Sequence, residues 1–278
     1  MSRSYPGVAA VTGAASGIGR ATCLAFANGG CSKLALLDCN VAGLEDTKAL
    51  VSQIISSSQR SPDLIVIEVD VTSPEAVTHA YSSIRTHFSR IDYSVQCAGI
   101  GSPIIESISC SVEIFDRQTA VNYRGLWLCT REVIKIMQGQ TLNTEAYPEA
   151  NIPATRAQRG SIVNISSTLA LYAQAFCAPY SGSKGGVLAV TRADAMDCVS
   201  HKIRVNAVLP GLIDTPMTMP NSEEREWFEK NVASRVPMRR LGQPEEIADL
   251  CVFLSGTGAS YVTGQAWAAD GGALGGYY

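Results

Sequence analysis

Tyr180 and Lys184 are the residues with the clearest capacity for chemistry, and they lie four positions apart in a stretch with a helical pattern. This spacing places both side chains on one face of a helix, about one turn apart. A free tyrosine has a pKa of ~10, and a neighbouring ammonium is expected to stabilise the phenolate and lower that pKa. The pair therefore predicts a group that takes a proton from an alcohol or gives one to a ketone. By itself the pair is a weak indication, because the same spacing occurs on solvated helix surfaces.

Other polar residues fall near one predicted edge of a sheet. Ser167 lies thirteen residues before Tyr180 and follows the predicted strand 161–165. Asn122 falls in a long predicted helix after the fourth strand, and Pro210-Gly211 follows the sixth. In open α/β sheets, ligands bind at the carboxyl ends of the strands. The candidate catalytic residues are therefore Ser167, Tyr180, Lys184 and Asn122.

A glycine-rich turn follows the first predicted strand and opens a helix, with the sequence Thr12-Gly13-Ala14-Ala15-Ser16-Gly17-Ile18-Gly19. Gly13 permits a tight turn, Gly17 lets the backbone approach a pyrophosphate, and Gly19 allows the helix to pack closely on the strand. The amino terminus of that helix attracts negative charge. This context predicts a dinucleotide-binding turn. The expected cofactor contacts in it are Gly13, Ser16, Gly17, Ile18 and Gly19.

Asp38 ends the second predicted strand, nineteen residues after Gly19. A carboxylate about 20 residues beyond the turn hydrogen-bonds the adenosine ribose 2′-hydroxyl in dinucleotide-binding folds. A 2′-phosphate there would meet like charge, and neither Cys39 nor Asn40 supplies a cation to neutralise it. The sequence therefore favours NAD(H) over NADP(H). In the alternative interpretation, Asp38 merely caps the next helix.

The composition is that of a globular protein that acts on a small molecule. The chain has 278 residues, of which 46% are hydrophobic and 17% charged, and its net charge is -3. A slightly negative chain has no excess of positive charge with which to bind nucleic acid or an anionic membrane. The length fits one domain of α/β type.

Targeting and metal signals are not seen in the sequence. The first strand-like run begins at Val8, which leaves no room for a signal peptide, and no apolar stretch is long enough to span a bilayer. The nine cysteines form no C-x-x-C pair and mostly fall in apolar runs, as reduced core thiols do. The three histidines are scattered, so no metal site is expected. We therefore expect a cytoplasmic protein.

Short aliphatic or β-branched runs alternate with helix-patterned stretches, which is typical of a parallel sheet covered by helices. The expected strands are 8–11, 33–37, 64–69, 93–97, 161–165, 204–209 and 265–268. The expected helices are 18–28, 41–57, 74–88, 112–137, 178–199 and 245–254. We therefore expect an α/β fold: a single doubly wound Rossmann-type domain over residues 1–278, with a seven-stranded parallel sheet flanked by helices on both faces.

Two segments interrupt this alternation. Residues 138–159 are polar and follow a helix, so we expect a surface insertion at the amino ends of the strands, away from ligands. A mobile loop is the simpler interpretation of it, and a functional role is the alternative. Residues 212–240 follow a strand directly and contain several methionines and aromatic residues, so they are the expected substrate lid.

The motifs together resemble the short-chain dehydrogenase/reductase family over nearly the whole chain, in its NAD-preferring branch with a Tyr-x-x-x-Lys active site. Several features are similar to members from fungal specialised metabolism. The motifs that carry the resemblance are Thr12 to Gly19, Asp70-Val71-Thr72, Gln96-Cys97-Ala98-Gly99, Asn122, Ser166-Ser167, Tyr180-x-x-x-Lys184 and Pro210-Gly211-x-x-x-Thr215.

The resemblance implies a role for each group. Ser167 would hydrogen-bond the substrate oxygen, and Lys184 would tune Tyr180 and hold the nicotinamide ribose. Asn122 would support a water linked to Lys184. Thr215 and the backbone near Ile213 would bind the carboxamide. The further implied cofactor contacts are Asp70, Val71, Cys97, Ala98, Gly99, Tyr180, Lys184, Pro210 and Gly211; Asp70 has the alternative of acting only as a loop cap.

The chain departs from the family pattern at two places. The family usually has Asn-Asn-Ala-Gly where this chain has Gln96-Cys97-Ala98-Gly99. The first asparagine steadies the central sheet in the family, so Gln96 puts that contact in doubt. Ala170 stands where a glycine commonly follows the catalytic serine by three, which narrows the pocket wall slightly.

Apolar and aromatic residues on the expected ligand face suggest the kind of substrate. They include no Arg or Lys, which favours a bulky, apolar, ring-bearing alcohol or ketone over a phosphorylated or carboxylated one. For any single member, ordinary core packing is the simpler interpretation. The expected substrate residues are Leu169, Tyr172, Phe176, Met217 and Trp227, with Phe228 beside them.

Three functions are compatible with these features. The leading one is an NAD-dependent alcohol dehydrogenase or ketoreductase, and the nearest rival is an NADPH-using ketoreductase of biosynthesis. A non-catalytic nucleotide-sensing protein on the same fold is disfavoured, because a sensor needs no intact Ser167, Tyr180 and Lys184. The family resemblance implies a homodimer or homotetramer, with a monomer as the alternative.

Overall fold

Seven parallel strands form one sheet in the computed structural model, which describes residues 5–101, 103–219, 221–231 and 233–275. The strand order is β3-β2-β1-β4-β5-β6-β7. The strands are β1 (Val8–Thr12), β2 (Lys33–Asp38), β3 (Asp63–Glu68), β4 (Tyr93–Gln96), β5 (Gly160–Ile165), β6 (Ile203–Pro210) and β7 (Ala266–Ala269). All seven expected strands are found, each within about a residue of its expected bounds.

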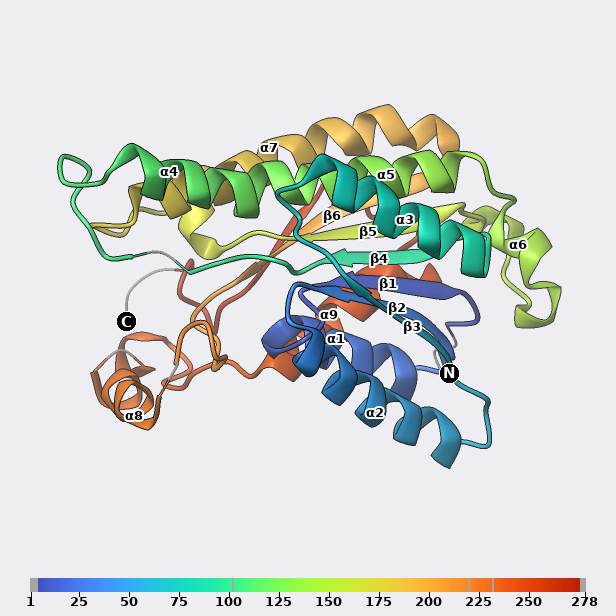
Figure 1. Cartoon of the computed structure of the whole chain (residues 1–278), viewed down its shortest axis with the longest axis horizontal. Helices are drawn as coiled ribbons and strands as arrows, with labels where there is room; N and C mark the ends of the chain where they lie inside the picture. Colours follow the sequence, from blue (N-terminus) through green and yellow to red (C-terminus); the bar gives the residue numbers. More distant parts are fainter. Residues whose placement is uncertain (1–4, 102, 220, 232, 276–278) are drawn as a thin grey trace.

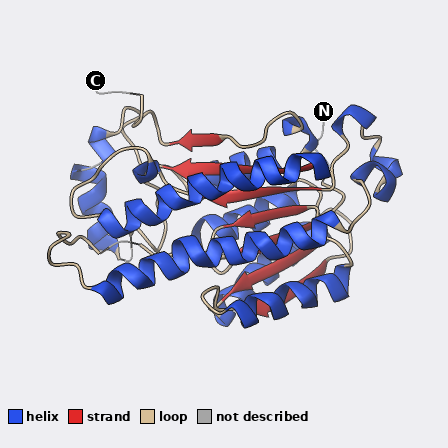
Figure 2. Ribbon diagram, turned by 90° about the horizontal axis from the view of Figure 1, so that it is seen from above, coloured by secondary structure: helices blue, strands red, loops and turns tan. Residues whose placement is uncertain are grey.

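Helices cover both faces of the sheet (Figure 1). One face carries α1 (Gly17–Asn28), α2 (Val41–Ser57) and α9 (Pro244–Ser255). The opposite face carries α3 (Pro74–Phe88), α4 (Val112–Thr119), α5 (Leu126–Gln138) and α7 (Ala178–Cys198). Figure 2 shows the parallel strands running under this second layer. The predicted Rossmann-type fold is therefore confirmed.

The two helical layers pack on alternate residues of the same strands. In β1, Ala9 and Val11 join the core on the α1 face, while Val8 and Ala10 join the core on the α3 face. Successive side chains of a strand point to opposite faces, so a fully buried strand needs an unbroken apolar run. The run Val8–Thr12, buried throughout, meets that requirement.

The chain reverses its direction of travel across the sheet between β1 and β4. From β1 it moves outward to β2 and β3, and then returns to place β4 on the other side of β1. Such a switch point opens a crevice at the carboxyl ends of the strands, where ligands bind in sheets of this kind. The fold therefore places the candidate site above β1 and β4.

The helix expected over 112–137 is not continuous. A π-helical segment, Ala120–Gly125, lies between α4 and α5, and it contains Asn122. No proline or glycine precedes this change of helical period, so the sequence pattern gave no sign of it. Short π-helical segments occur often at functional sites.

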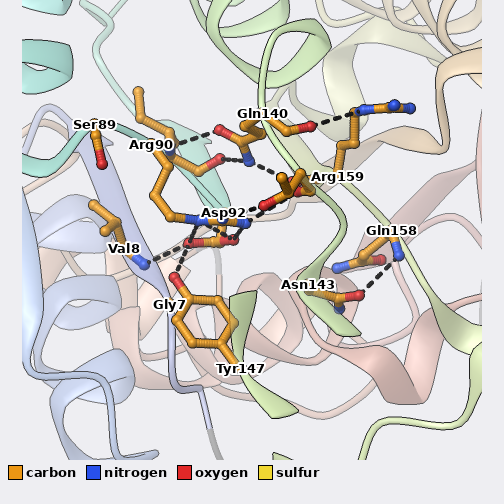
Figure 3. Close-up of polar contacts among 12 residues, drawn as sticks. Gly7, Val8, Ser89, Arg90, Asp92, Gln140, Asn143, Tyr147, Gln158 and Arg159 are labelled. Carbon is orange, nitrogen blue, oxygen red and sulfur yellow. Dashed lines mark hydrogen bonds and ion pairs between the residues drawn. The ribbon is translucent and has the colours of Figure 1, made fainter. Parts of the chain in front are cut away.

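The insertion 138–159 lies at the amino ends of the strands and is folded into α6 (Asn143–Ala146) and two short 3₁₀ turns, Pro148–Ala150 and Ala154–Arg156. Its Tyr147 hydroxyl donates to Asp92 Oδ2 at 2.8 Å, and Arg90 donates to the same carboxylate (Figure 3). Gln140 binds the backbone of Ile91 just before β4. We call Arg90, Asp92, Gln140 and Tyr147 the amino-end network. These contacts anchor a segment whose simplest interpretation was a mobile loop.

Residues 212–240 form a small unit with its own core. They contain α8 (Ser222–Asn231) and the 3₁₀ turn Ala233–Arg235. Arg225 of α8 makes an ion pair with Asp214. The apolar residues of this core are Met219, Ala233 and Leu241, with Leu212 and Phe228 packed against them.

Within the described ranges, no helix is long and apolar enough to cross a membrane. The same residues hold no group of three or more His, Cys, Asp or Glu side chains suited to a metal ion. All nine cysteines are free thiols.

Candidate active site

A cavity of about 630 Å³ opens at the carboxyl ends of the central strands. Every residue expected to contact the cofactor lines it. They are Gly13, Ser16, Gly17, Ile18, Gly19, Asp38, Asp70, Val71, Cys97, Ala98, Gly99, Tyr180, Lys184, Pro210, Gly211, Ile213 and Thr215. The sequence motifs, though far apart in the chain, therefore face one space.

The glycine turn leaves room for a ligand at the amino terminus of α1. Gly13 and Gly17 have φ of 68° and 50°, a region that L side chains rarely adopt. A Cβ on Gly19 would lie 2.0 Å from the Gly13 carbonyl oxygen, so the close approach of α1 to the turn requires glycine there. The first N–H groups of a helix have no partner within it, and they favour an anion. The turn fits the pyrophosphate of a dinucleotide.

Asp38 is held at the adenosine end of the cavity by backbone donors. Its Oδ2 accepts from Ala15 N at 3.1 Å, and its Oδ1 accepts from Asn40 N at 3.0 Å. The side chain that caps α2 is Asn40, which accepts from Gly43 N, so the alternative that Asp38 caps this helix is wrong. A carboxylate offers about four acceptor sites, which leaves capacity for a hydroxyl donor.

Within the described residues, the lining positions on either side of Asp38, Leu37 and Cys39, carry no positive charge that could meet a phosphate. Arg20, the residue after the glycine turn, donates to the carbonyl oxygens of Ala15 and Gly43 and to Thr47 Oγ1, and it does not line the cavity. Asp70 Oδ1 accepts from the backbone and side chain of Thr72, so Asp70 shapes its own loop while also lining the cavity.

Tyr180, Lys184 and Ser167 converge at the other end. Lys184 Nζ lies 5.8 Å from the centre of the Tyr180 ring and donates to Ile165 O at 2.9 Å. The Ser167 side chain hydrogen-bonds the Tyr180 side chain. Ser166 Oγ instead donates to the Lys184 backbone carbonyl at 2.8 Å. The two neighbouring serines therefore differ, and Ser167 is the one whose hydroxyl meets Tyr180.

Burial controls both titrating groups of this cluster. It raises the pKa of Tyr180, and the hydrogen bond from Ser167 only partly opposes the rise. Burial also lowers the pKa of Lys184 to about 8. The expected net lowering of the tyrosine pKa is therefore not found, because desolvation of the phenolate is the largest effect on it. Tyr180 is a neutral phenol at pH 7, which is the form that donates a proton.

Asn122 stands behind the cavity and does not line it. Its side chain is fully buried, with Oδ1 accepting from Ile100 N at 2.8 Å and Nδ2 donating to Ile100 O at 3.0 Å. A Cβ on Gly99 would lie 3.1 Å from Asn122 Oδ1 and 3.6 Å from Lys184 Nζ. Glycine at 99 thus lets the Asn122 amide and the Lys184 ammonium approach the same point.

Gln96 supplies the contact that its departure from the family pattern had put in doubt. Its Oε1 accepts from Thr12 Oγ1 at 3.1 Å, and its Nε2 donates to Ser94 Oγ at 2.9 Å and to the Tyr81 hydroxyl at 3.2 Å. Thr12 Oγ1 in turn accepts from Ala98 N. The longer glutamine side chain therefore joins β4 to β1 and to α3.

Of the five expected substrate residues, Met217 alone lines the cavity. Leu169 is half-buried in the 3₁₀ turn Thr168–Ala170. Tyr172, Phe176 and Trp227 are 43%, 47% and 57% exposed, because each stands on a loop or helix surface outside the cavity. Phe228 packs into the core of the 212–240 unit. Their placement on the pocket wall is therefore corrected.

Arg117 is a lining residue that the sequence analysis missed. It lies on α4, and within the described residues its guanidinium has no ion pair or hydrogen bond. Arg117 and Val121 are one helical turn apart and both line the cavity. The spacing was visible in the sequence, but which face of the helix meets the cavity was not. The expected set of pocket residues included no Arg or Lys, and Arg117 corrects that set.

The segment 215–218 bridges the two ends of the cavity. A Cβ on Gly17 would lie 3.4 Å from Thr215, and a Cβ on Gly101 would lie 3.3 Å from Met217 Cγ. Thr218 Oγ1 binds Ile213 O at 2.5 Å and meets Thr215 Oγ1 at 2.8 Å. These bonds fix the shape of the start of the 212–240 unit, which lies against the glycine turn and the loop after β4.

Comparisons with known proteins agree with this geometry. A family model described as enoyl-(acyl carrier protein) reductase matches residues 13–273. The chain is 37% identical over 267 residues to the short-chain dehydrogenase fogB of Aspergillus ruber, with 96% of each chain covered. Levodione reductase superimposes with a TM-score of 0.84 at 30% identity, over 99% of this chain and 100% of that one. A 3-ketoacyl-(acyl-carrier-protein) reductase from Brucella melitensis, complexed with NADH, gives 0.78 at 29% identity, over 96% of this chain and 98% of that one.

Proposed function

Because this chain belongs to the short-chain dehydrogenase/reductase family and is an oxidoreductase of that family, we propose that it transfers a hydride between NAD(H) and a secondary alcohol or ketone. The observation that carries the proposal is the convergence of Ser167, Tyr180 and Lys184 on the cavity that the glycine turn and Asp38 also line. A nicotinamide cofactor bound there supplies or accepts the hydride.

Each side chain of the site has a separate role in the proposed reaction. In ketone reduction, Tyr180 donates its phenolic proton to the carbonyl oxygen, on which negative charge develops. Ser167 donates a hydrogen bond to the same oxygen and stabilises that charge. Lys184, as an ammonium, stabilises the phenolate that remains. Asn122 holds the Ile100 backbone in place, and Gly99 leaves room between the Asn122 amide and Lys184 Nζ.

Ketone reduction is the direction that we propose for neutral pH. Tyr180 stays protonated at neutral pH, because burial raises its pKa further above the usual value of a tyrosine. Alcohol oxidation uses the same residues in reverse and needs the phenolate, so it is expected to gain rate as pH rises. The names of two similar structures, levodione reductase and 3-ketoacyl-(acyl-carrier-protein) reductase, support reduction.

NAD(H) is the proposed cofactor, with NADP(H) as the rival. The proposal is supported by the Asp38 carboxylate at the adenosine end and by the engagement of Arg20 with backbone carbonyls. The NADH found in the Brucella melitensis relative is consistent with it. Asp38→Ala should lower kcat/KM with NADH and raise it with NADPH, because the repulsion of a 2′-phosphate is removed. A wild-type enzyme that prefers NADPH would overturn this assignment.

The proposed substrate is a bulky, largely apolar, ring-bearing ketone or alcohol. Ile100, Val121, Pro216 and Met217 are apolar residues that line the same cavity as Ser167. The test is a panel of polycyclic ketones, acyclic ketones and anionic sugars, with NADH oxidation followed by absorbance. Ring-bearing ketones should give the highest kcat/KM, and a preference for anionic sugars would overturn the substrate class.

We also propose a homodimer or homotetramer in the cytoplasm. Trp127 on α5 and Met196 on α7 are exposed apolar residues on the same helical layer, and covering them would favour association. The nine free thiols suit a reducing compartment. Light scattering of the purified protein and cell fractionation test the two statements, and a monomer or a secreted protein would contradict them.

A further inference from the structure

Gln118 is a buried amide next to the catalytic cluster to which the proposed mechanism assigns no role. It lies on α4, one turn before Asn122, and is 2% exposed. Its Nε2 donates to Gly101 O at 2.5 Å, and its Oε1 accepts from Asn122 Nδ2 at 2.8 Å. It thus joins Asn122 to the loop after β4, which lines the cavity.

The chemistry of these contacts allows only one orientation of each amide. Asn122 faces both the N–H and the C=O of Ile100, so its oxygen must meet the N–H and its nitrogen the C=O. Both protons of Asn122 Nδ2 are then used, one on Ile100 O and one on Gln118 Oε1. Gln118 must in turn present its nitrogen to the Gly101 carbonyl. A rotated amide in either residue would oppose two donors or two acceptors.

The position of Asn122 needs this additional support. Gln118 belongs to the regular α-helix, whereas Asn122 belongs to the π-helical segment 120–125. The π-helix is rare and appears mostly as single turns within α-helices, so the regular helical repeat does not fix Asn122. The Gln118–Asn122 hydrogen bond spans this junction and ties the two parts together.

We propose that Gln118 is a positioning residue, which fixes the Asn122 amide and the Ile100–Gly101 backbone so that Asn122 Oδ1 stays turned toward Gly99 and Lys184. The inference rests on the proposed function. With Gln118 in place, Asn122 Oδ1 has one acceptor site left beyond its bond from Ile100 N, on the side where a Cβ on Gly99 would meet both Oδ1 and Lys184 Nζ. Without Gln118, one Asn122 proton and the Gly101 carbonyl lose their partner.

The test compares Gln118→Leu and Gln118→Glu with a matched control, Gln140→Leu. Gln140 is a glutamine whose side-chain amide binds the N–H and C=O of Ile91 at the opposite end of β4, as Asn122 binds those of Ile100. Gln118→Leu should lower kcat roughly 10- to 100-fold, as loss of an outer supporting partner does at other sites. Gln118→Glu keeps the acceptor for Asn122 and should retain more of kcat. The buried acid should stay protonated, because only its O–H can donate to the Gly101 carbonyl in place of the lost amide N–H, so the pH profile should keep the limb seen in wild type.

Gln140→Leu should lower the melting temperature and leave kcat and the pH profile within about twofold of wild type, because its bonds lie far from the cavity. A Gln118→Leu variant that behaves in the same way would show a merely structural role and overturn the proposal. Exchange of the Asn122 side-chain amide protons, followed by NMR, gives a readout independent of turnover. Faster exchange in Gln118→Leu than in wild type is expected, and unchanged exchange would overturn the proposal even if no ketone is reduced. A wild-type protein that binds NADH but reduces no ketone would contradict only the proposed function.

Discussion

The two ends of β4 carry the same hydrogen-bonding device and use it for different purposes. At the carboxyl end, Asn122 binds the N–H and C=O of Ile100 through its side-chain amide. At the amino end, Gln140 binds the N–H and C=O of Ile91 in the same manner. Each amide replaces a sheet partner for backbone groups just outside the strand, which would otherwise be left unpaired.

The two ends of β4 differ in how completely the charged side chains near each amide are paired. At the amino end, Asp92 accepts from Arg90, from the Tyr147 hydroxyl and from Val8 N, so both ions are satisfied. At the carboxyl end, Tyr180 and Lys184 face a cavity and keep capacity for a ligand. A polar network in which every group has a partner stabilises a fold. Titratable groups beside a cavity, which can still bind a ligand, can exchange protons with it. The first prediction is therefore that changes at the two ends separate activity from stability.

Ser167→Ala should give a large loss of kcat at the carboxyl end. It removes the hydrogen bond to the reacting oxygen, and loss of one such donor costs about 10²- to 10³-fold in kcat. Ser167 Oγ also accepts from Leu169 N at the start of the 3₁₀ turn Thr168–Ala170, so a modest fall in the melting temperature is expected, too small to account for the loss of kcat. Steady-state kinetics and a thermal melt on the same preparation measure both. Ser166→Ala is the matched control, since Ser166 Oγ binds a backbone carbonyl; an equal loss of kcat there would contradict the assignment.

Asp92→Asn should give the converse result. The Asp92 and Arg90 side chains are 3% and 14% exposed, so the substitution weakens a mostly buried ion pair. The free energy of unfolding should fall by roughly 2 to 3 kcal/mol, with kcat unchanged. Chemical denaturation measures the first quantity. A large loss of kcat in folded Asp92→Asn would break the separation between the two ends.

The pH dependence of reduction should report the carboxyl end alone. Lys184 has a pKa of about 8, so kcat/KM should decline above that pH as the ammonium is lost, approaching tenfold per unit. The unfolded lysine keeps its proton to about pH 10.5, so this group adds stability as pH rises between 8 and 10.5. The decline is therefore not due to unfolding at Lys184. Lys184→Arg should abolish this limb, and a limb that persists in that variant would assign it to another group.

Arg117→Leu should have the smallest effect and should depend on the ligand. Arg117 is exposed at the cavity, whereas Arg90 at the amino end is held by Asp92. Ketones that carry a carboxylate should show a KM several-fold higher in the variant, because a charge-assisted hydrogen bond is lost. Neutral ring-bearing ketones should be unaffected. An unchanged KM for both classes would show that Arg117 is only a solvated surface residue.

The sequence predicted the fold correctly at positions where only one kind of residue meets the structural requirement. Unbroken apolar runs identified the strands because a strand buried on both faces needs them, and Gly13, Gly17 and Gly19 identified the turn because a side chain does not fit. The shared cavity followed from the ends of successive strands. These features depend on local pattern and on general topology.

The features that the sequence did not predict depend on how distant parts of the chain pack together, which local sequence patterns do not contain. No proline or glycine precedes the π-helical segment around Asn122, and the lining role of Arg117 depends on how α4 is rotated. The rise in the Tyr180 pKa depends on burial, which outweighs the hydrogen bond from Ser167. Tyr172, Phe176 and Trp227 are aromatic residues on loops and on a helix surface, where composition does not fix whether a side chain turns inward.

The most direct test of the catalytic assignment is single-turnover reduction of a ring-bearing ketone by enzyme-bound NADH, in wild type and in Tyr180→Phe. The variant keeps the ring and removes the acidic proton, so the hydride-transfer rate should fall by 10² to 10⁴, while the Kd for NADH and the melting temperature stay close to wild type. An unchanged rate in a Tyr180→Phe protein that still binds NADH would contradict the account.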